Sequence, residues 1–199
     1  MDILSTDIDL HFVRALQVGD ESALTELIRK YEEPLFRLIY RYVGVEETAR
    51  DLLQETFVRM YFQINRFKPQ AKFVTWLYAV ATNLCHDHAR SKRGRQSALT
   101  DSLDNPGSHQ ELTAANSNPA EIAESRERVA ALEDAIARLP HHLKLALVLF
   151  SIEGHSPQEC AKMLGITSKA VETRVYRARK ILEKELRQQG KSALTSFNS

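Results

Sequence analysis

The sequence predicts an all-α protein made of two small helical domains joined by a flexible linker. Three observations support this fold class. Through most of both halves, apolar residues recur every three or four positions, as they do on the buried face of a helix. Residues 96–122 interrupt this pattern and are rich in Ser, Asn, Asp, Pro and Gly. No run alternates Val, Ile and Thr as a strand would.

Three amphipathic helices are expected in the first half. Their apolar positions cover residues 24–42, 52–64 and 73–85. Asp20 can cap the first helix, and Gly44 follows its last periodic residue. Pro69 separates the second helix from the third, because proline cannot continue a helix.

The second half is helical again and contains a helix-turn-helix pattern. A strongly apolar helix ends at Gly154, and Ser156, Pro157 and Glu159 then form the signature of a capping box with proline at the first helical position. A short turn around Gly165 leads into a second helix, which is the order of elements in a DNA-binding helix-turn-helix.

These patterns divide the chain into four segments. They are a first domain (1–95), an acidic polar linker (96–125), a second domain (126–187) and a C-terminal tail (188–199) that we expect to fray.

The net charge of +1 hides two basic regions. Residues 66–95 contain seven Lys or Arg against the single acid Asp87, and residues 162–180 contain six against Glu172. The linker between them has five acids and no Lys or Arg. Clustered positive charge of this kind favours contact with nucleic acid.

The helix after Gly165 carries its charges on one face. Val171, Val175, Ala178 and Leu182 form an apolar seam. The opposite face carries Ser168, Lys169, Glu172, Thr173, Arg177 and Lys180. Such a helix can place side chains on base edges in the major groove, while His155 and Ser156 at the start of the preceding helix can bind phosphate. A charged structural hairpin is the alternative.

The first basic region mixes aromatic and cationic side chains, as proteins that bind single strands do. The aromatic residues are Phe67, Phe73, Trp76 and Tyr78, near Lys68, Lys72, Arg90, Arg93 and Arg95. Phe73 and Trp76 share the apolar stripe, so both are expected mainly in the core. Thr75, Thr82, Asn83, His86, Asp87 and Arg90 lie off that stripe and are better candidates for contact.

Three stretches together resemble the extracytoplasmic-function (ECF) group of bacterial RNA polymerase sigma factors, members of the sigma-70 family. They are "DLLQETFVRMY" (51–61), "FVTWLYAVATNLCHDHARSKRGR" (73–95) and "LPHHLKLALVLFSIEGHSPQECAKMLGITSKAVETRVYRARKIL" (139–182). The first looks like region 2.2, the second like the promoter-melting segment, and the third like region 4. The resemblance covers roughly residues 10–95 and 125–187.

The resemblance implies an alternative sigma factor that directs promoter-specific initiation. Polymerase would be bound through Asp51, Gln54, Glu55 and Arg59. The melted −10 element would be bound through Phe67, Lys68, Lys72, Thr75, Trp76, Asn83, Asp87, Arg90 and Arg93. The −35 duplex would be read by Ser168, Lys169, Glu172, Thr173 and Arg177, with Arg174 and Arg179 nearer phosphates or packing, and with His155 and Ser156 on the backbone.

The implied partners are core RNA polymerase (its β′ coiled coil and β flap), promoter DNA and an anti-sigma factor, and the implied location is the bacterial cytoplasm. No cofactor or metal is implied. Glu172 stands where many relatives carry Lys or Arg, so the −35 sequence is expected to differ from the commonest one.

Other function classes fit the sequence less well. No HExxH, P-loop, GxSxG or dinucleotide motif indicates an enzyme, and the two cysteines do not form a CxxC pair. The sequence contains no run of eighteen apolar residues, so no membrane-spanning helix is predicted. A helix-turn-helix regulator that acts without polymerase would not need residues 51–61, and a sigma-like decoy for an anti-sigma factor would not need the basic surfaces.

Overall fold

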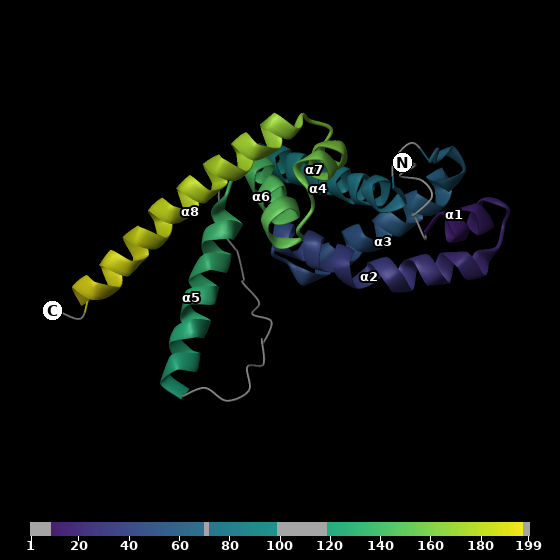
Figure 1. Ribbon diagram of the computed structural model, residues 1–199. Helices are drawn as coiled ribbons and strands as arrows, with labels where there is room; N and C mark the ends of the chain where they lie inside the picture. Colours follow the sequence, from purple (N-terminus) through teal and green to yellow (C-terminus); the bar gives the residue numbers. More distant parts are fainter. Residues whose placement is uncertain (1–8, 70–71, 99–118, 197–199) are drawn as a thin grey trace.

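The computed structural model describes the backbone of residues 9–69, 72–98 and 119–196, and side chains over 9–69, 72–91 and 128–188. The chain is helical, and no strand occurs in these residues (Figure 1). The elements are α1 (Asp9–Gln17), α2 (Glu21–Val43), α3 (Glu46–Gln63), the 3₁₀ turn η2 (Ile64–Arg66), α4 (Phe73–Ala98), α5 (Pro119–Arg138), α6 (His141–Leu147), the π-helical turn η3 (Val148–Ile152), α7 (Pro157–Leu164) and α8 (Ser168–Ser196). None of the helices over the described residues is long and apolar enough to cross a membrane.

Helices α1 to α4 form an N-terminal bundle. The predicted ends of α2 are confirmed: the Asp20 carboxylate accepts from the Ser22 N–H at 2.9 Å, and Gly44 adopts φ 76°, a left-handed conformation that glycine reaches without strain. Leu35 and Ile39 of α2 are fully buried, and so is Phe73 at the start of α4. Each such side chain contributes about 1.5–3 kcal/mol through burial.

Helices α5 to α8 form the C-terminal half, in which α7 and α8 make the predicted helix-turn-helix. The capping box of α7 is present, with both Ser156 and Glu159 bonding the other's backbone N–H. Gly165 ends α7 with φ 63°. The predicted seam of α8 is confirmed, since Val171, Val175, Ala178 and Leu182 are all buried.

Three stretches differ from the expectation. The periodicity predicted no helix before Asp20, yet α1 is helical and buries Leu10, Val13 and Leu16. Helix α4 extends to Ala98 and α5 begins at Pro119, both inside the segment assigned to the linker. Helix α8 continues to Ser196, through most of the tail expected to fray. Extending an existing helix is far easier than starting one, so polar residues of good helix propensity can prolong both helices.

The two halves share one hydrophobic core instead of lying apart. Buried residues of both halves belong to the same cluster, and α7 packs along α4 while η3 and α6 meet α2. Figure 1 shows α7 lying against α4, with α5 and α8 diverging from the body of the molecule. The described chain is therefore in a closed arrangement.

Candidate nucleic-acid interface

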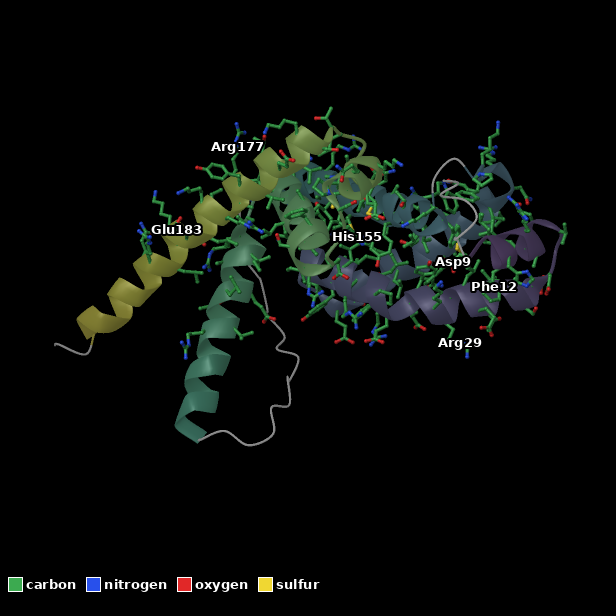
Figure 2. The ribbon with its side chains drawn as sticks, in the orientation of Figure 1. Asp9, Phe12, Arg29, His155, Arg177 and Glu183 are labelled. Carbon is green, nitrogen blue, oxygen red and sulfur yellow. The ribbon has the colours of Figure 1, made fainter. Side chains whose placement is uncertain are left out.

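The outward face of α8 presents most of the side chains expected to read duplex DNA. Lys169, Glu172, Thr173 and Arg177 are exposed, opposite the buried seam. Figure 2 shows Arg177 projecting away from the molecule. The Lys169 ammonium lies 3.3 Å from the Glu172 carboxylate, and the Thr173 hydroxyl donates to the Lys169 carbonyl at 2.8 Å. These local bonds leave the face open to a partner.

An exposed tyrosine lies on the same face and was not among the predicted site residues. Tyr176 is 63% exposed, and the Lys180 ammonium lies 5.9 Å from its ring centroid. Its position three residues after Thr173 places it on this face, which the helical spacing alone could have shown. An aromatic ring beside cations adds a surface that can stack or contact a base methyl group.

Two arginines of α8 lie away from the centre of this face. Arg174 is only partly exposed. Arg179 donates to the Ser151 hydroxyl at 3.1 Å, and its guanidinium lies 6.0 Å from the centroid of the Phe150 ring. Both positions suit the expected roles in packing or phosphate contact better than base reading.

Two more residues expected at the duplex, His155 and the N-cap Ser156, lie directly before α7, and Ser168 at the start of α8 is partly exposed. The Ser156 N–H donates to the Glu159 carboxylate at 3.1 Å, and this bond is the main reason that the pKa of Glu159 is lowered. His155 is half-buried, with its ring edge-on to Tyr78 of α4 at 5.0 Å between centroids. Burial lowers the pKa of His155, and its Nε2 atom is buried without a hydrogen bond.

Burial reduces the number of predicted residues that can contact the melted −10 strand. Phe67 is buried and its ring contacts those of Phe73 and Trp76 at 5.8 and 5.3 Å between centroids. Trp76 is partly exposed, whereas Thr75 is buried. In this closed arrangement the Thr75 side chain is therefore not available to DNA.

The other members of that set have more open positions. Lys68, Lys72 and Asn83 are exposed, and Asp87 pairs with Arg90 on the surface of α4. The side chain of Arg93 lies outside the described residues. The Lys72 ammonium lies 3.4 Å from the Glu159 carboxylate of α7. His86, another residue off the apolar stripe, is half-buried, and its pKa is lowered by burial and then by Arg174.

The residues expected at polymerase share the outer surface of α3. Asp51 and Gln54 are exposed, and Arg59 donates to the Glu55 carboxylate at 2.8 Å. Val58, Tyr61 and Phe62 are exposed beside them, and Phe62 is 76% exposed. A helix that presents both charges and apolar side chains to solvent has the composition of a protein-binding surface. Among the described residues, no three His, Cys, Asp or Glu gather as metal ligands.

Comparison with known proteins agrees with this arrangement. The family model "Sigma-70 region 2" matches residues 27–95, and "Sigma-70, region 4" matches residues 130–182. The chain is 31% identical over 180 residues to the ECF RNA polymerase sigma factor SigW of Bacillus subtilis, covering 88% of this chain and 95% of the relative. It is 31% identical to the RNA polymerase sigma-H factor of Pseudomonas aeruginosa, covering 92% and 96%.

Solved structures show the same fold. CnrH in complex with the cytosolic domain of CnrY matches with a TM-score of 0.66 at 24% identity, covering 92% of this chain and 99% of that one. The sigma factor RpoE of Bartonella quintana, in complex with the anti-sigma factor NepR, matches with a TM-score of 0.65 at 20% identity, covering 82% and 96%. The chain belongs to the ECF RNA polymerase sigma factors, alternative sigma factors that direct promoter-specific transcription by RNA polymerase.

Proposed function

We propose that the two halves of this sigma factor divide promoter recognition, with α3 on core polymerase, α4 on the melted −10 strand, and α7 and α8 on the −35 duplex. On this proposal residues 1–95, with α1 to α4, are the first domain, and residues 126–187, with α7 and α8, are the second. The chain contributes binding and no catalytic step of its own, and it acts in the bacterial cytoplasm.

The observation that carries this proposal is the outward face of α8. A solvated helix usually alternates the sign of its charges, but here cations dominate a face that also carries Thr173 and Tyr176. The ion pair of Lys169 and the hydrogen bond of the Thr173 hydroxyl both stay within α8, so neither ties the face to another element. Arg177, at its centre, can read guanine with two hydrogen bonds.

The −10 part of the proposal rests on position in α4. Asn83 and Arg90 lie on exposed sides of the helix, and Lys68 is exposed in the loop before it. Exposed amide and cationic groups beside partly exposed Trp76 suit an unpaired strand, which is held by stacking and backbone charge. Because the structural relative RpoE was solved with the anti-sigma factor NepR, we also propose an anti-sigma factor as a partner.

The test is run-off transcription with core polymerase and a promoter library, using the full chain and an Arg177→Ala variant. We expect promoter-specific transcripts with the wild type. Arg177→Ala should lose about 1–3 kcal/mol of discrimination at one −35 base pair if that contact is bidentate. Arg187→Ala is the matched control, because Arg187 lies farther along α8 and pairs with Glu183.

Two outcomes would contradict the proposal. Absence of any transcript above core polymerase alone would remove the assigned promoter role. Transcription by Arg177→Ala with an unchanged −35 preference would remove the base-reading role assigned to Arg177.

A further inference from the structure

The last residue of α1 is hydrogen-bonded to the connection between α3 and α4. The Gln17 side chain donates from Nε2 to the Ile64 carbonyl at 2.8 Å and to the Phe67 carbonyl at 3.4 Å. Both partners are acceptors, so the contacts require the amide NH2 group, which has two hydrogens to donate. These two hydrogen bonds, which we call the Gln17 tie, join parts of the chain that lie 47 and 50 residues apart in the sequence.

The tied backbone is a turn directly before Lys68. The Phe67 N–H donates to the Ile64 carbonyl at 3.1 Å and closes η2. The Ile64 oxygen therefore accepts from Phe67 and from Gln17, which uses both of its lone pairs. Phe67 leaves the turn in an extended conformation, with φ −64° and ψ 123°. The Gln17 tie thus acts where the chain turns out of η2 toward Lys68.

Phe67 is held from two sides. Its ring is 7% exposed and packs against Phe73 and Trp76 of α4, with centroids 5.8 and 5.3 Å away. Its carbonyl oxygen accepts from Gln17 of α1. Ring packing alone leaves the backbone torsions of Phe67 free to change, and fixing them costs conformational entropy. The second attachment fixes the direction in which the chain continues to the exposed Lys68.

Helix α1 is a firm attachment because its first residue is also anchored. The buried Asp9 carboxylate accepts hydrogen bonds from the Lys30 ammonium and from the Tyr31 hydroxyl of α2. The apolar face of α1 is buried between its two ends. Figure 1 shows α1 at the end of the N-terminal bundle that lies farthest from α8. None of the residues expected at DNA or polymerase lies on α1, so its effect on promoter recognition would be indirect.

We propose that Gln17 is a positioning residue for the −10 element, because it fixes the turn from Ile64 to Phe67 in the shape that the unpaired strand meets. The inference rests on the proposed function, in which Phe67, Lys68 and Trp76 belong to the surface for that strand. A loop that is already fixed loses less conformational entropy when it binds. Gln17 acts through the turn and does not itself contact DNA.

The single tryptophan of the chain reports on the turn without any DNA. Trp76 is partly exposed, and the Phe67 ring packs against it. Gln17→Met removes both donors and keeps the length of the side chain. In the free full chain, we expect this variant to increase acrylamide quenching of Trp76 fluorescence and to shift its emission to the red. Gln17→Lys keeps an N–H donor and should restore the wild-type quenching.

The second readout is strand binding by holoenzyme formed from core polymerase and the full chain. The probe is a fluorescent single-stranded oligonucleotide with a −10 element found in the transcription assay, and anisotropy measures its binding. We expect Gln17→Met to lower the affinity for this strand about three- to tenfold. The affinities for a −35 duplex and for core polymerase should not change, because their proposed surfaces lie on α8 and α3.

The matched control is Lys30→Met, which removes one hydrogen bond at the opposite end of α1 and leaves the Gln17 tie in place. Asp9 keeps the hydrogen bond from the Tyr31 hydroxyl. This variant should unfold at a lower temperature than the wild type, with unchanged Trp76 quenching and unchanged −10 affinity. The control separates a loss of helix stability from a loss of the Gln17 tie.

Two results together support the positioning role. They are increased quenching and weaker −10 binding in Gln17→Met, with neither change in Lys30→Met. Recovery of the quenching in Gln17→Lys assigns the effect to hydrogen-bond donation.

Three results would overturn it. Unchanged quenching in Gln17→Met would show that the tie does not hold the turn. Increased quenching with unchanged −10 affinity would remove its role in recognition. An equal loss of −10 affinity in Lys30→Met would assign the effect to the stability of α1. Quenching needs no promoter, so failure of the transcription assay would defeat the proposed function and still leave the Gln17 tie measured.

Discussion

At the scale of single residues, His155 links protonation to the closed arrangement. Its pKa lies below the ordinary value of 6.5 because burial against Tyr78 disfavours the charged ring. Glu153 and Glu159 act in the opposite direction, but they are the smaller causes. A closed form that holds His155 neutral has its full stability above pH 6.5 and loses stability as the pH falls below that value.

Acidification should therefore open the chain. We expect the radius of gyration from small-angle X-ray scattering to increase between pH 7.5 and 5.5. His155→Phe keeps an aromatic ring on Tyr78 but cannot take up a proton, so it should expand less. Equal expansion of both proteins would assign the effect to another group, with His86 the first candidate because its pKa is also lowered by burial.

Sequence reasoning reached the residues whose roles depend on local pattern. The Ser156 cap, the turn at Gly165 and the outward position of Arg177 follow from spacing along one or two helices. The burial of Thr75 and Thr82 could not be read in this way. Both threonines lie off the apolar stripe of α4, and only packing from elsewhere in the chain removes them from solvent.

At the scale of secondary structure elements, α3 joins charges and exposed apolar side chains on one surface. Its Glu55–Arg59 pair lies four residues apart, so the two charges can still pair after they are exchanged, although the acid on the N-terminal side is the better order. The first turn of the same helix carries a second pair of this kind, Glu46–Arg50, at 2.7 Å. The two pairs allow a comparison in which the helix is kept and only the position of the charges changes.

Exchanging the charges of Glu55 and Arg59 should weaken polymerase binding. We expect the double variant Glu55→Arg/Arg59→Glu to lose about ten- to hundredfold in affinity for core polymerase, equivalent to about 1.4–2.8 kcal/mol. Fluorescence anisotropy of labelled protein titrated with core polymerase measures this. Glu46→Arg/Arg50→Glu is the control and should bind normally. If the two exchanges have the same effect, the polymerase surface on α3 is wrongly assigned.

The positions of the helices were mostly predictable from the sequence, but their lengths were not. The cap at Asp20 and the stop at Gly44 are local signals, so α2 was placed well. Polar extensions such as the last turns of α4 and α8 carry no apolar period, and they depend on a helix that already exists. The second buried face of α4 was missed for a related reason, since Thr82 and Ala89 are too polar or too small to stand out from a surface.

At the scale of the whole molecule, the shared core implies coupled stability. Two domains on a linker would unfold separately, but here Lys144 and Thr82 bond across the halves and the hydrophobic cluster is continuous. Removing either half would leave polar and apolar groups of the other newly exposed. Their unfolding should therefore be cooperative.

Scanning calorimetry can test this coupling. We expect one transition for the wild type and two for Thr82→Gln, because the larger side chain at the buried Thr82 position forces α4 and α7 apart. Arg29→Glu is the control, because Arg29 pairs with Glu26 of its own helix, and it should keep one transition. Two transitions in the wild type would show that the halves are thermally independent and that the closed contact adds little to stability.

The contact between the two halves depends on the number of residues in the π-helical turn η3, and not only on which residues they are. Such a turn usually contains one residue more than an α-helix requires, and it directly precedes Glu153. Deleting Ile152, which is 40% exposed, would rotate the downstream chain by about 100° and carry Glu153 away from Arg41 with both members of that ion pair still encoded. A single-codon deletion would thus release the halves where conservative substitutions would not, and an increased radius of gyration of such a variant would reveal it.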